Sequence, residues 1–189
     1  MRRAAKLGLL LESRDLDVPN AILSRLASQG ELDRIRRGVY LGASIEPHPL
    51  SEAAAVVKKT PRAVVGLLTA LEYYRLTTAW PDGIWVLTPR NQNPPREERL
   101  HVVRVRPDFL NPTLGINELE IHGVDVRLTS PTRTVLDCWK HTRRVSRTIA
   151  LEALQELRSS EHWDGRALVR LARRLDLWTR LRPYVEALG

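Results

Sequence analysis

The chain has 189 residues, of which 43% are hydrophobic and 28% are charged, and its formal net charge is +8 at pH 7. This balance excludes an intrinsically disordered chain, and the short apolar runs exclude a membrane span. The first fifteen residues lack the pattern of a signal peptide, and the single cysteine cannot form an internal disulfide, so we expect a cytoplasmic protein.

The positive charge favours an anionic partner, and nucleic acid is the usual one in the cytoplasm. Residues 1–50 carry eight basic and six acidic side chains, residues 51–129 carry ten and nine, and residues 130–189 carry twelve and seven. Most of the excess therefore lies at the C-terminal end. Because 26 of the 30 basic residues are arginine, GC-rich codon usage is an alternative explanation of the charge.

The first thirty residues predict three short helices. Residues 2–11 suit one helix, and residues 12–16 begin a one-turn segment. In the third helix, Asp17 can cap the start, Pro19 fits the first turn and Gly30 can end it in the left-handed conformation.

A basic hairpin is predicted next. Residues 32–35 and 39–41 suit two short strands, and Gly38 supplies the positive φ that the turn between them needs. Helices followed by such a hairpin are typical of a winged helix-turn-helix, in which the recognition helix enters the major groove and the wing contacts phosphate. A winged helix used for protein contacts is the alternative. The candidate DNA-binding residues are Asn20, Ser24, Arg25, Arg34, Arg36 and Arg37.

The remaining sequence predicts helices, then strands, then helices. We expect helices over 50–60 and 64–76, strands over 83–89 and 100–106, a hairpin over 119–130, and helices over 130–141, 144–158 and 165–181. The fold class is therefore α+β. We predict a winged helix-turn-helix domain over 1–46, followed over 47–189 by a mixed α/β domain with a small sheet and C-terminal helices.

Catalytic motifs are scarce. The five histidines and single cysteine form no zinc-binding pattern. Asp108, Glu118 and Glu120 resemble the acidic half of a metal-dependent nuclease, but the position where such nucleases usually carry lysine is His122. Carboxylates exposed on an edge strand are the alternative. We expect no catalytic residues, metal or cofactor, and we keep a nuclease that uses Asp108 and Glu120 as the second hypothesis.

Four segments resemble the AbiEi-type antitoxins of the AbiE type IV toxin–antitoxin systems: residues 23–40, 64–90, 124–157 and 181–188. The third segment is the most specific. It combines a strand, a Ser-Pro-x-Arg-Thr helix start and an Asp-Cys-Trp-Lys run.

The resemblance implies an antitoxin that also represses its own operon. Its winged helix would bind inverted repeats at the promoter. The protein would be a monomer in solution and bind cooperatively on DNA. Its C-terminal domain would oppose an AbiEii-like nucleotidyltransferase toxin without needing a stable complex. The resemblance implies a basic face on this domain, which maps to Arg133, Lys140, Arg143 and Arg144. The alternative interpretation is that these side chains are on the solvent-exposed faces of amphipathic helices.

Two further features belong to this interpretation. Arg166, Arg170 and Arg173 extend a similar basic row at helical spacing. The first helix is shorter than the family usually has, so a third hypothesis is an antitoxin that has lost DNA binding.

Overall fold

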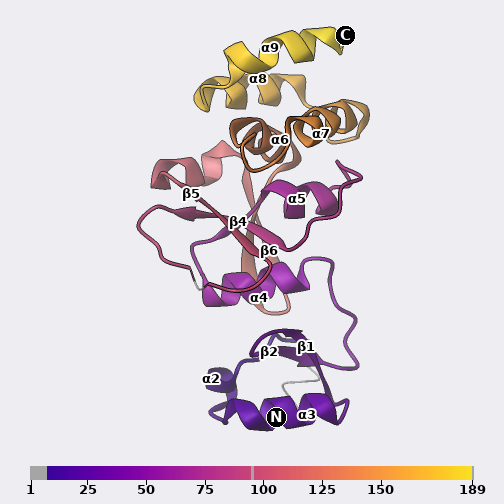
Figure 1. Ribbon diagram of the computed structural model, residues 1–189, viewed down its shortest axis with the longest axis vertical. Coiled ribbons are helices and arrows are strands. Elements are labelled where there is room, and N and C mark those ends of the chain that lie inside the picture. The colour runs from indigo at the N-terminus through magenta and orange to yellow at the C-terminus, as the bar shows by residue number, and fades with distance from the viewer. Residues whose placement is uncertain (1–7, 95, 189) are drawn as a thin grey trace. The chain divides into compact units, whose positions relative to one another are not determined.

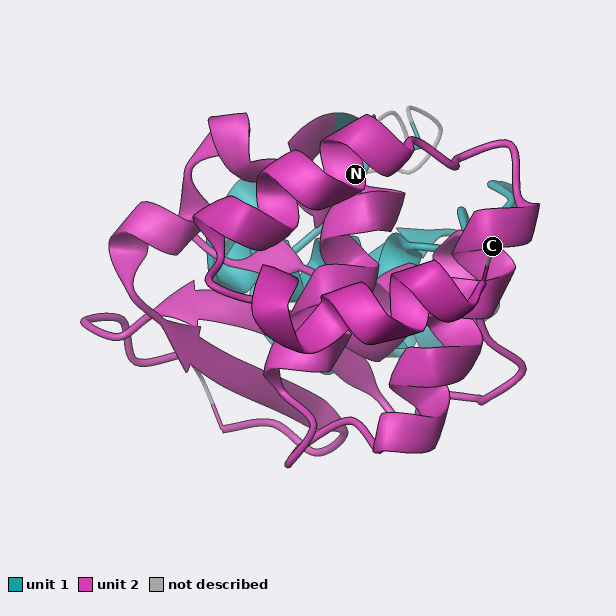
Figure 2. Ribbon diagram, turned by 90° about the horizontal axis from the view of Figure 1, so that it is seen from above, with its two compact units in different colours: residues 1–61, 119–126 teal, residues 62–118, 127–189 magenta. Residues whose placement is uncertain are grey.

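The computed structural model describes residues 8–94 and 96–188, and it has the predicted α+β class. The chain forms two compact units, coloured separately in Figure 2: residues 1–61 with 119–126, and residues 62–118 with 127–189. The expected boundary after residue 46 differs from this division, because the linker, the next helix and the tip of a later hairpin all belong to the first unit.

Of the helix predicted over 2–11, only residues 8–11 are described, and they form a turn and extended chain rather than a helix. Residues 1–7 lie outside the described residues. Leu11 pairs with Tyr40, through a Leu11 N–H to Tyr40 C=O bond of 2.8 Å and the reverse bond of 2.9 Å. Both side chains are buried, so a strand-like bridge places Leu11 in the core where a helix would not.

Two helices follow, α2 (Ser13–Leu16) and α3 (Asn20–Ser28) (Figure 1). Asp17 does not cap α3 as predicted; it ends α2 in the left-handed conformation, with φ of 51°. Pro19 stands immediately before α3, so Asp17 is too far from its first turn to act as its N-cap.

The predicted basic hairpin is confirmed as β1 (Leu32–Arg36) and β2 (Val39–Gly42), and Gly38 has the expected positive φ, 76°. The hairpin is followed by α4 (Ser51–Lys59). Leu23 of α3 and Tyr40 of β2 are both fully buried, and they pack with Leu11 and Leu32 in one apolar cluster. Burying these side chains fixes α3 against the hairpin.

The second sheet has the strand order β5-β4-β3-β7-β6. Its strands are β3 (Val64–Val65), β4 (Ile84–Pro89), β5 (Leu100–Val105), β6 (Ile116–Ile121) and β7 (Val124–Thr129). β3 lies in the segment predicted as one long helix, because its buried β-branched pair completes the sheet between β4 and β7. Only α5 (Leu67–Tyr73) is helical there.

Gly83 permits the parallel pairing of β4 with β5. A Cβ at this position would lie 2.2 Å from the carbonyl oxygen of Arg99, which accepts a hydrogen bond from the Ile84 N–H at 2.9 Å. No other residue type leaves room for this close backbone approach.

Short 3-10 turns and four helices complete the second unit. They are η1 (Pro107–Leu110), η2 (Pro112–Leu114), α6 (Pro131–Lys140), α7 (Arg147–Ser159), α8 (Gly165–Arg174) and α9 (Trp178–Ala187). α6 contacts α5, α7 and α8, and α9 contacts α8. No described helix is both long enough and apolar enough to cross a membrane.

The predicted helix over 165–181 is two helices. Leu175 and Leu177 are both buried, and side chains two residues apart point to different faces of one continuous helix. A turn with Asp176 at φ of 57° places both leucines in the core. Pro183, expected to end this helix, lies inside α9.

Arg133 lies at the centre of the second unit, with 1% of its surface exposed. Its Nε donates to both carboxylate oxygens of Asp137, at 3.0 and 2.9 Å. Its Nη1 donates to the Leu114 carbonyl at 2.8 Å, and its Nη2 to the Phe109 carbonyl at 3.0 Å. One guanidinium therefore joins α6 to η1 and η2.

We expect Arg133→Met to lower the free energy of unfolding by about 3–5 kcal/mol, because it leaves the buried Asp137 carboxylate unpaired. The double variant Arg133→Met/Asp137→Leu should lose much less, since no buried charge remains. Arg182→Met, which breaks an exposed pair of the same i,i+4 spacing with Glu186, is the matched control and should leave urea denaturation unchanged. If Arg133→Met and Arg182→Met lower the free energy of unfolding by the same amount, the buried pair has no special structural role.

Candidate nucleic-acid interface

The outer face of α3 carries the side chains expected to reach base edges. Asn20, Ser24 and Arg25 are all exposed, whereas Leu23 on the inner face is fully buried. The helix is amphipathic because its apolar residues recur at helical spacing, so one stripe packs on the hairpin and the opposite face stays polar.

Ser24 has a second role that the sequence did not suggest. Its Oγ lies 2.9 Å from the hydroxyl oxygen of Tyr40, whose ring is fully buried beneath α3. A buried phenol needs a hydrogen-bond partner, and Ser24 supplies it. Ser24 therefore fastens α3 to β2, and this bond competes with any contact that its hydroxyl makes to a base.

The beginning of α3 lies beside the turn of the hairpin. The amide oxygen of Asn20 is 3.9 Å from the position that a Cβ on Gly38 would occupy. Two predicted parts of the interface, the start of α3 and the β1–β2 turn, are thus brought together in one unit. A hairpin that flanks an exposed helix can contact the backbone next to the groove that the helix enters.

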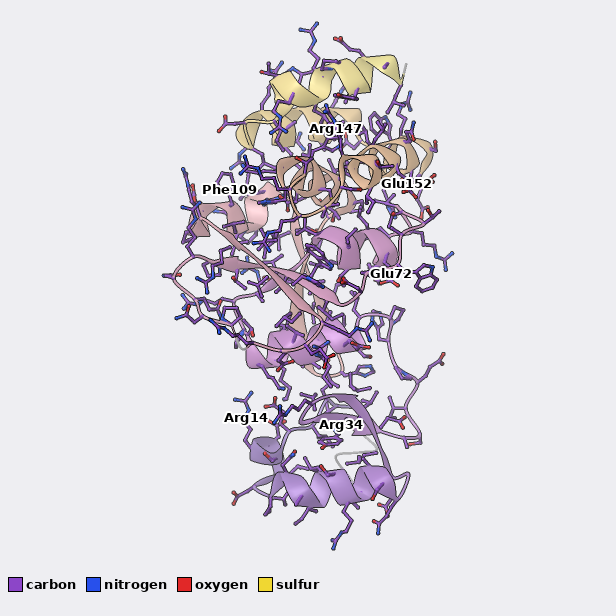
Figure 3. All side chains as sticks on the ribbon, in the orientation of Figure 1. Arg14, Arg34, Glu72, Phe109, Arg147 and Glu152 are labelled. Carbon is purple, nitrogen blue, oxygen red and sulfur yellow. The ribbon has the colours of Figure 1, made fainter. Side chains whose placement is uncertain are left out.

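The three arginines of the hairpin have different environments. Arg36 forms an ion pair with Glu52 of α4, with Nη1 and Oε2 3.2 Å apart, and only 10% of its side chain is exposed. Arg34, labelled in Figure 3, and Arg37 are exposed, and their side chains have no hydrogen bond or ion pair to the described residues. Arg25 shares this condition, so three arginines are available to phosphate.

The first unit has little positive charge of its own. Residues 1–61 and 119–126 contain ten basic and nine acidic side chains, a formal net charge of +1. Several basic groups are already paired: Arg14 with Glu12, and Lys58 with Asp15. Among its described residues, the positive charge left for a ligand is therefore that of a few arginines rather than a broad positive field.

In the second unit, the structure corrects the basic face that was expected at Arg133, Lys140, Arg143 and Arg144. Arg133 is buried and bound to Asp137, so it cannot be part of a surface. Lys140 is half-buried: its Nζ donates to the Leu175 carbonyl at 3.1 Å and lies 4.0 Å from the ring centre of Phe109. Burial lowers the pKa of Lys140.

Arg143 and Arg144 are the exposed members of that set. They lie in the turn between α6 and α7, and neither side chain has a hydrogen bond or ion pair within the described part of the chain. His141, which precedes them, has a buried Nε2 without a hydrogen-bond partner. The exposed basic group at this end of α6 is therefore two arginines rather than four side chains.

A loop missed by the sequence analysis is held by Glu152 of α7, labelled in Figure 3. Its Oε1 accepts from the Thr78 N–H at 2.6 Å and from the Thr78 hydroxyl at 2.8 Å, and these bonds lower the pKa of Glu152. The same loop carries Trp80, 88% exposed. Because Thr78 and Glu152 are 74 residues apart, no local pattern could indicate their contact.

The carboxylates of the nuclease hypothesis have other surroundings. Asp108 lies in η1 and binds the guanidinium of Arg106, whose hydrogen bonds lower the pKa of this carboxyl. Glu118 and Glu120 are exposed on β6. The described residues contain no group of three or more histidine, cysteine, aspartate or glutamate side chains placed to hold a metal ion.

No protein-family model and no curated protein matches the chain. Among solved structures, the chain is similar to the Rv2827c protein from Mycobacterium tuberculosis, with a TM-score of 0.69 and 14% sequence identity. The similarity covers 98% of this chain and 74% of that chain. At this identity the likeness shows the fold alone.

His141 gives the second unit a pH-dependent stability. Burial, and then the charges of Lys140, Arg133 and Arg144, lower its pKa from 6.5 to about 4. The unfolded chain therefore binds this proton more tightly than the folded protein does. The contribution of His141 to the free energy of unfolding is fully present above about pH 6.5 and is lost as the pH falls towards 4. With solvent screening included, the loss is about 1–2 kcal/mol.

The measurement is urea denaturation between pH 4 and 7 for the native chain and for His141→Gln. The variant should lose this part of the pH dependence. If the free energy of unfolding of His141→Gln depends on pH as strongly as that of the native chain, other groups cause the acid sensitivity.

Proposed function

We propose that this chain is a non-enzymatic, sequence-specific DNA-binding protein that represses its own operon and acts as the antitoxin of an AbiE-like pair. The observation that carries the DNA-binding part is the placement of Asn20 beside the turn of the β1–β2 hairpin. This places an exposed polar helix face next to a basic hairpin, the pairing that a winged helix-turn-helix uses on DNA.

Most of the expected first helix lies outside the described residues, and α3 is supported without it. Leu23 is fully buried against the hairpin, and the Ser24–Tyr40 hydrogen bond fixes the same helix from its polar side. A rigid α3 favours DNA binding over the hypothesis that the short first helix has abolished it, because base contacts need a fixed helix.

The antitoxin part of the proposal rests on the resemblance of residues 124–157 to the AbiEi-type antitoxins. Within that segment, Ser130 caps α6 by accepting the Arg133 N–H at 3.3 Å, and Arg133 is needed for the core. The residues that remain for a partner are Arg143 and Arg144. The proposed partner is a nucleotidyltransferase toxin, opposed without a stable complex.

The DNA-binding proposal is tested with the triple variant Arg25→Gln/Arg34→Gln/Arg37→Gln and a labelled fragment of the operon's promoter. Each arginine that binds a phosphate releases about 0.9 counterion, so the slope of log K against log salt should become shallower by about 2.7. Asn20→Ala should instead lose discrimination at one base pair, by about 1–3 kcal/mol. Fluorescence anisotropy measures both effects.

The matched control removes an ion pair that already joins Arg36 of the hairpin to Glu52 of α4. In Arg36→Gln/Glu52→Gln the net charge is unchanged and the ion pair is lost, so affinity and slope should stay close to those of the native chain. Native-like promoter binding by the triple variant would exclude α3 and the hairpin as the DNA interface.

The antitoxin proposal is tested by growth of cells that express the neighbouring toxin gene together with this chain. Arg143→Glu/Arg144→Glu should lose most of the protection, because charge reversal repels an anionic partner. The triple variant of the first unit should protect as well as the native chain, which separates the two activities. Full protection by Arg143→Glu/Arg144→Glu would remove these arginines from the neutralising surface.

A further inference from the structure

The helix α8 has one buried face and one strongly basic face. Leu168, Leu171 and Ala172 pack into the core of the second unit. On the outer side, Arg166, Arg170 and Arg173 are all exposed and follow one another at i, i+4 and i+7. This spacing aligns the three side chains along one stripe of the helix, and we call them the α8 arginine row.

The α8 arginine row is not neutralised by the protein. None of its three side chains has a hydrogen bond or ion pair to any residue that the structure describes, and α8 contains no acidic residue. Neighbouring arginines behave differently. Arg174 donates to Thr113, and Arg182 pairs with Glu186. The row is therefore a set of three available cations aligned on one helix, whereas Arg143 and Arg144, whose side chains also have no partner among the described residues, lie in a turn.

This arrangement opposes the stability of α8. Like charges at i and i+4 repel by about 0.2–0.5 kcal/mol per pair on a helix surface. Arg166 also lies in the first turn, at the positive end of the helix dipole, where a cation is unfavourable, whereas Arg173 lies in the last turn, where a cation is favourable. A helix placed only to cover the core would be more stable with mixed charges at these positions, so the row points to a ligand that compensates the repulsion.

The same residues form a shallow, open patch on the surface. Gly165, Val169 and the three arginines line it, and all five belong to α8. The row spans about 10 Å along the helix axis, at 1.5 Å per residue, and duplex DNA presents about six charges over that length. A phosphate chain lying along α8 could therefore meet all three guanidinium groups.

We infer that the α8 arginine row binds the phosphodiester backbone of a nucleic acid. Nucleic-acid interfaces are polar and strongly positive, whereas protein interfaces have an apolar or aromatic centre. The patch contains no aromatic side chain and all of its charges are positive, although most of its lining surface is supplied by carbon atoms of Gly165, Val169 and the arginine stems. Arginine also matches phosphate by bidentate hydrogen bonding. These features favour nucleic acid over an acidic protein.

This surface is distinct from the interface proposed in the first unit, and it does not require that the chain be a repressor or an antitoxin. It reads no sequence, because backbone contacts carry no base information. It provides a second, non-specific site on the same chain.

The experiment uses the full-length chain with Arg25, Arg34 and Arg37 already changed to Gln, so that α8 is tested without the first interface. Into this background we introduce Arg166→Gln/Arg170→Gln/Arg173→Gln, or the matched control Arg62→Gln/Arg75→Gln/Arg90→Gln, which removes three exposed charges elsewhere in the second unit. Circular dichroism checks that each variant is folded. The probes are a labelled 20-bp DNA duplex of arbitrary sequence, a 20-bp RNA duplex, a 20-nucleotide oligo(U) and a polyglutamate of equal charge.

Fluorescence anisotropy is measured between 50 and 200 mM salt. Removing the α8 row should make the slope of log K against log salt shallower by about 2.7 for duplex DNA and by about 2.1 for single strands. For the duplex, the ratio of the affinities at 50 and 200 mM salt should therefore change by about fortyfold. The control should keep the slope of its parent. The DNA, RNA-duplex and oligo(U) arms identify the preferred nucleic acid, and a loss on any one of them that the control does not share supports the inference.

Three results would overturn the inference. The α8 variant and its parent could have equal salt slopes on every nucleic acid, or the α8 variant and the control could lose the same part of the salt slope. The third is that the α8 row binds polyglutamate more tightly than nucleic acid. Because the first interface is absent from the background, failure here leaves the promoter-binding test unaffected, and failure of that test leaves this one valid.

Discussion

The second unit is organised around the buried guanidinium of Arg133. Two of its hydrogen bonds link α6 to η1 and η2, and the other two go to Asp137, which supplies the counter-charge from one turn further along α6. Removing a charge from water costs several kcal/mol, so the pair is tolerated only because every bond has good geometry. Gly115 allows this fit, since a Cβ there would lie 3.1 Å from the Cβ of Arg133.

The buried pair also decides which positive charges remain for other molecules. Arg133 is bound internally, and Lys140, one turn later, is held by the Leu175 carbonyl and the ring of Phe109. Both basic side chains of α6 are therefore bound within the protein. Exposed positive charge in the second unit is left to other arginines, among them Arg143, Arg144 and the α8 arginine row. Counting basic residues along the sequence overstates the binding surface, because it includes arginines that replace apolar core.

Local signals allowed most of the elements to be predicted. Gly38 marked the hairpin turn, and Ser130 with Pro131 marked the start of α6. The errors share a cause: burial depends on distant residues. Leu11 extends because it pairs with Tyr40, and Arg133 is buried because carbonyls from residues 109 and 114 surround it. An arginine on an amphipathic helix looks the same in sequence whether its partner is solvent or a carbonyl 24 residues away.

The division of charge between the units bears on how the proposed functions combine. The first unit, residues 1–61 and 119–126, carries ten basic and nine acidic side chains, a net +1, whereas residues 62–118 and 127–189 carry twenty basic and thirteen acidic side chains, a net +7. Binding that comes from counterion release weakens steeply with salt, but hydrogen bonds to base edges do not depend on it in this way. Affinity for any nucleic acid would thus come mainly from the second unit, and selection of one sequence from α3. Under this division, rising salt weakens non-specific binding more than base recognition, so discrimination between sites increases as total affinity falls.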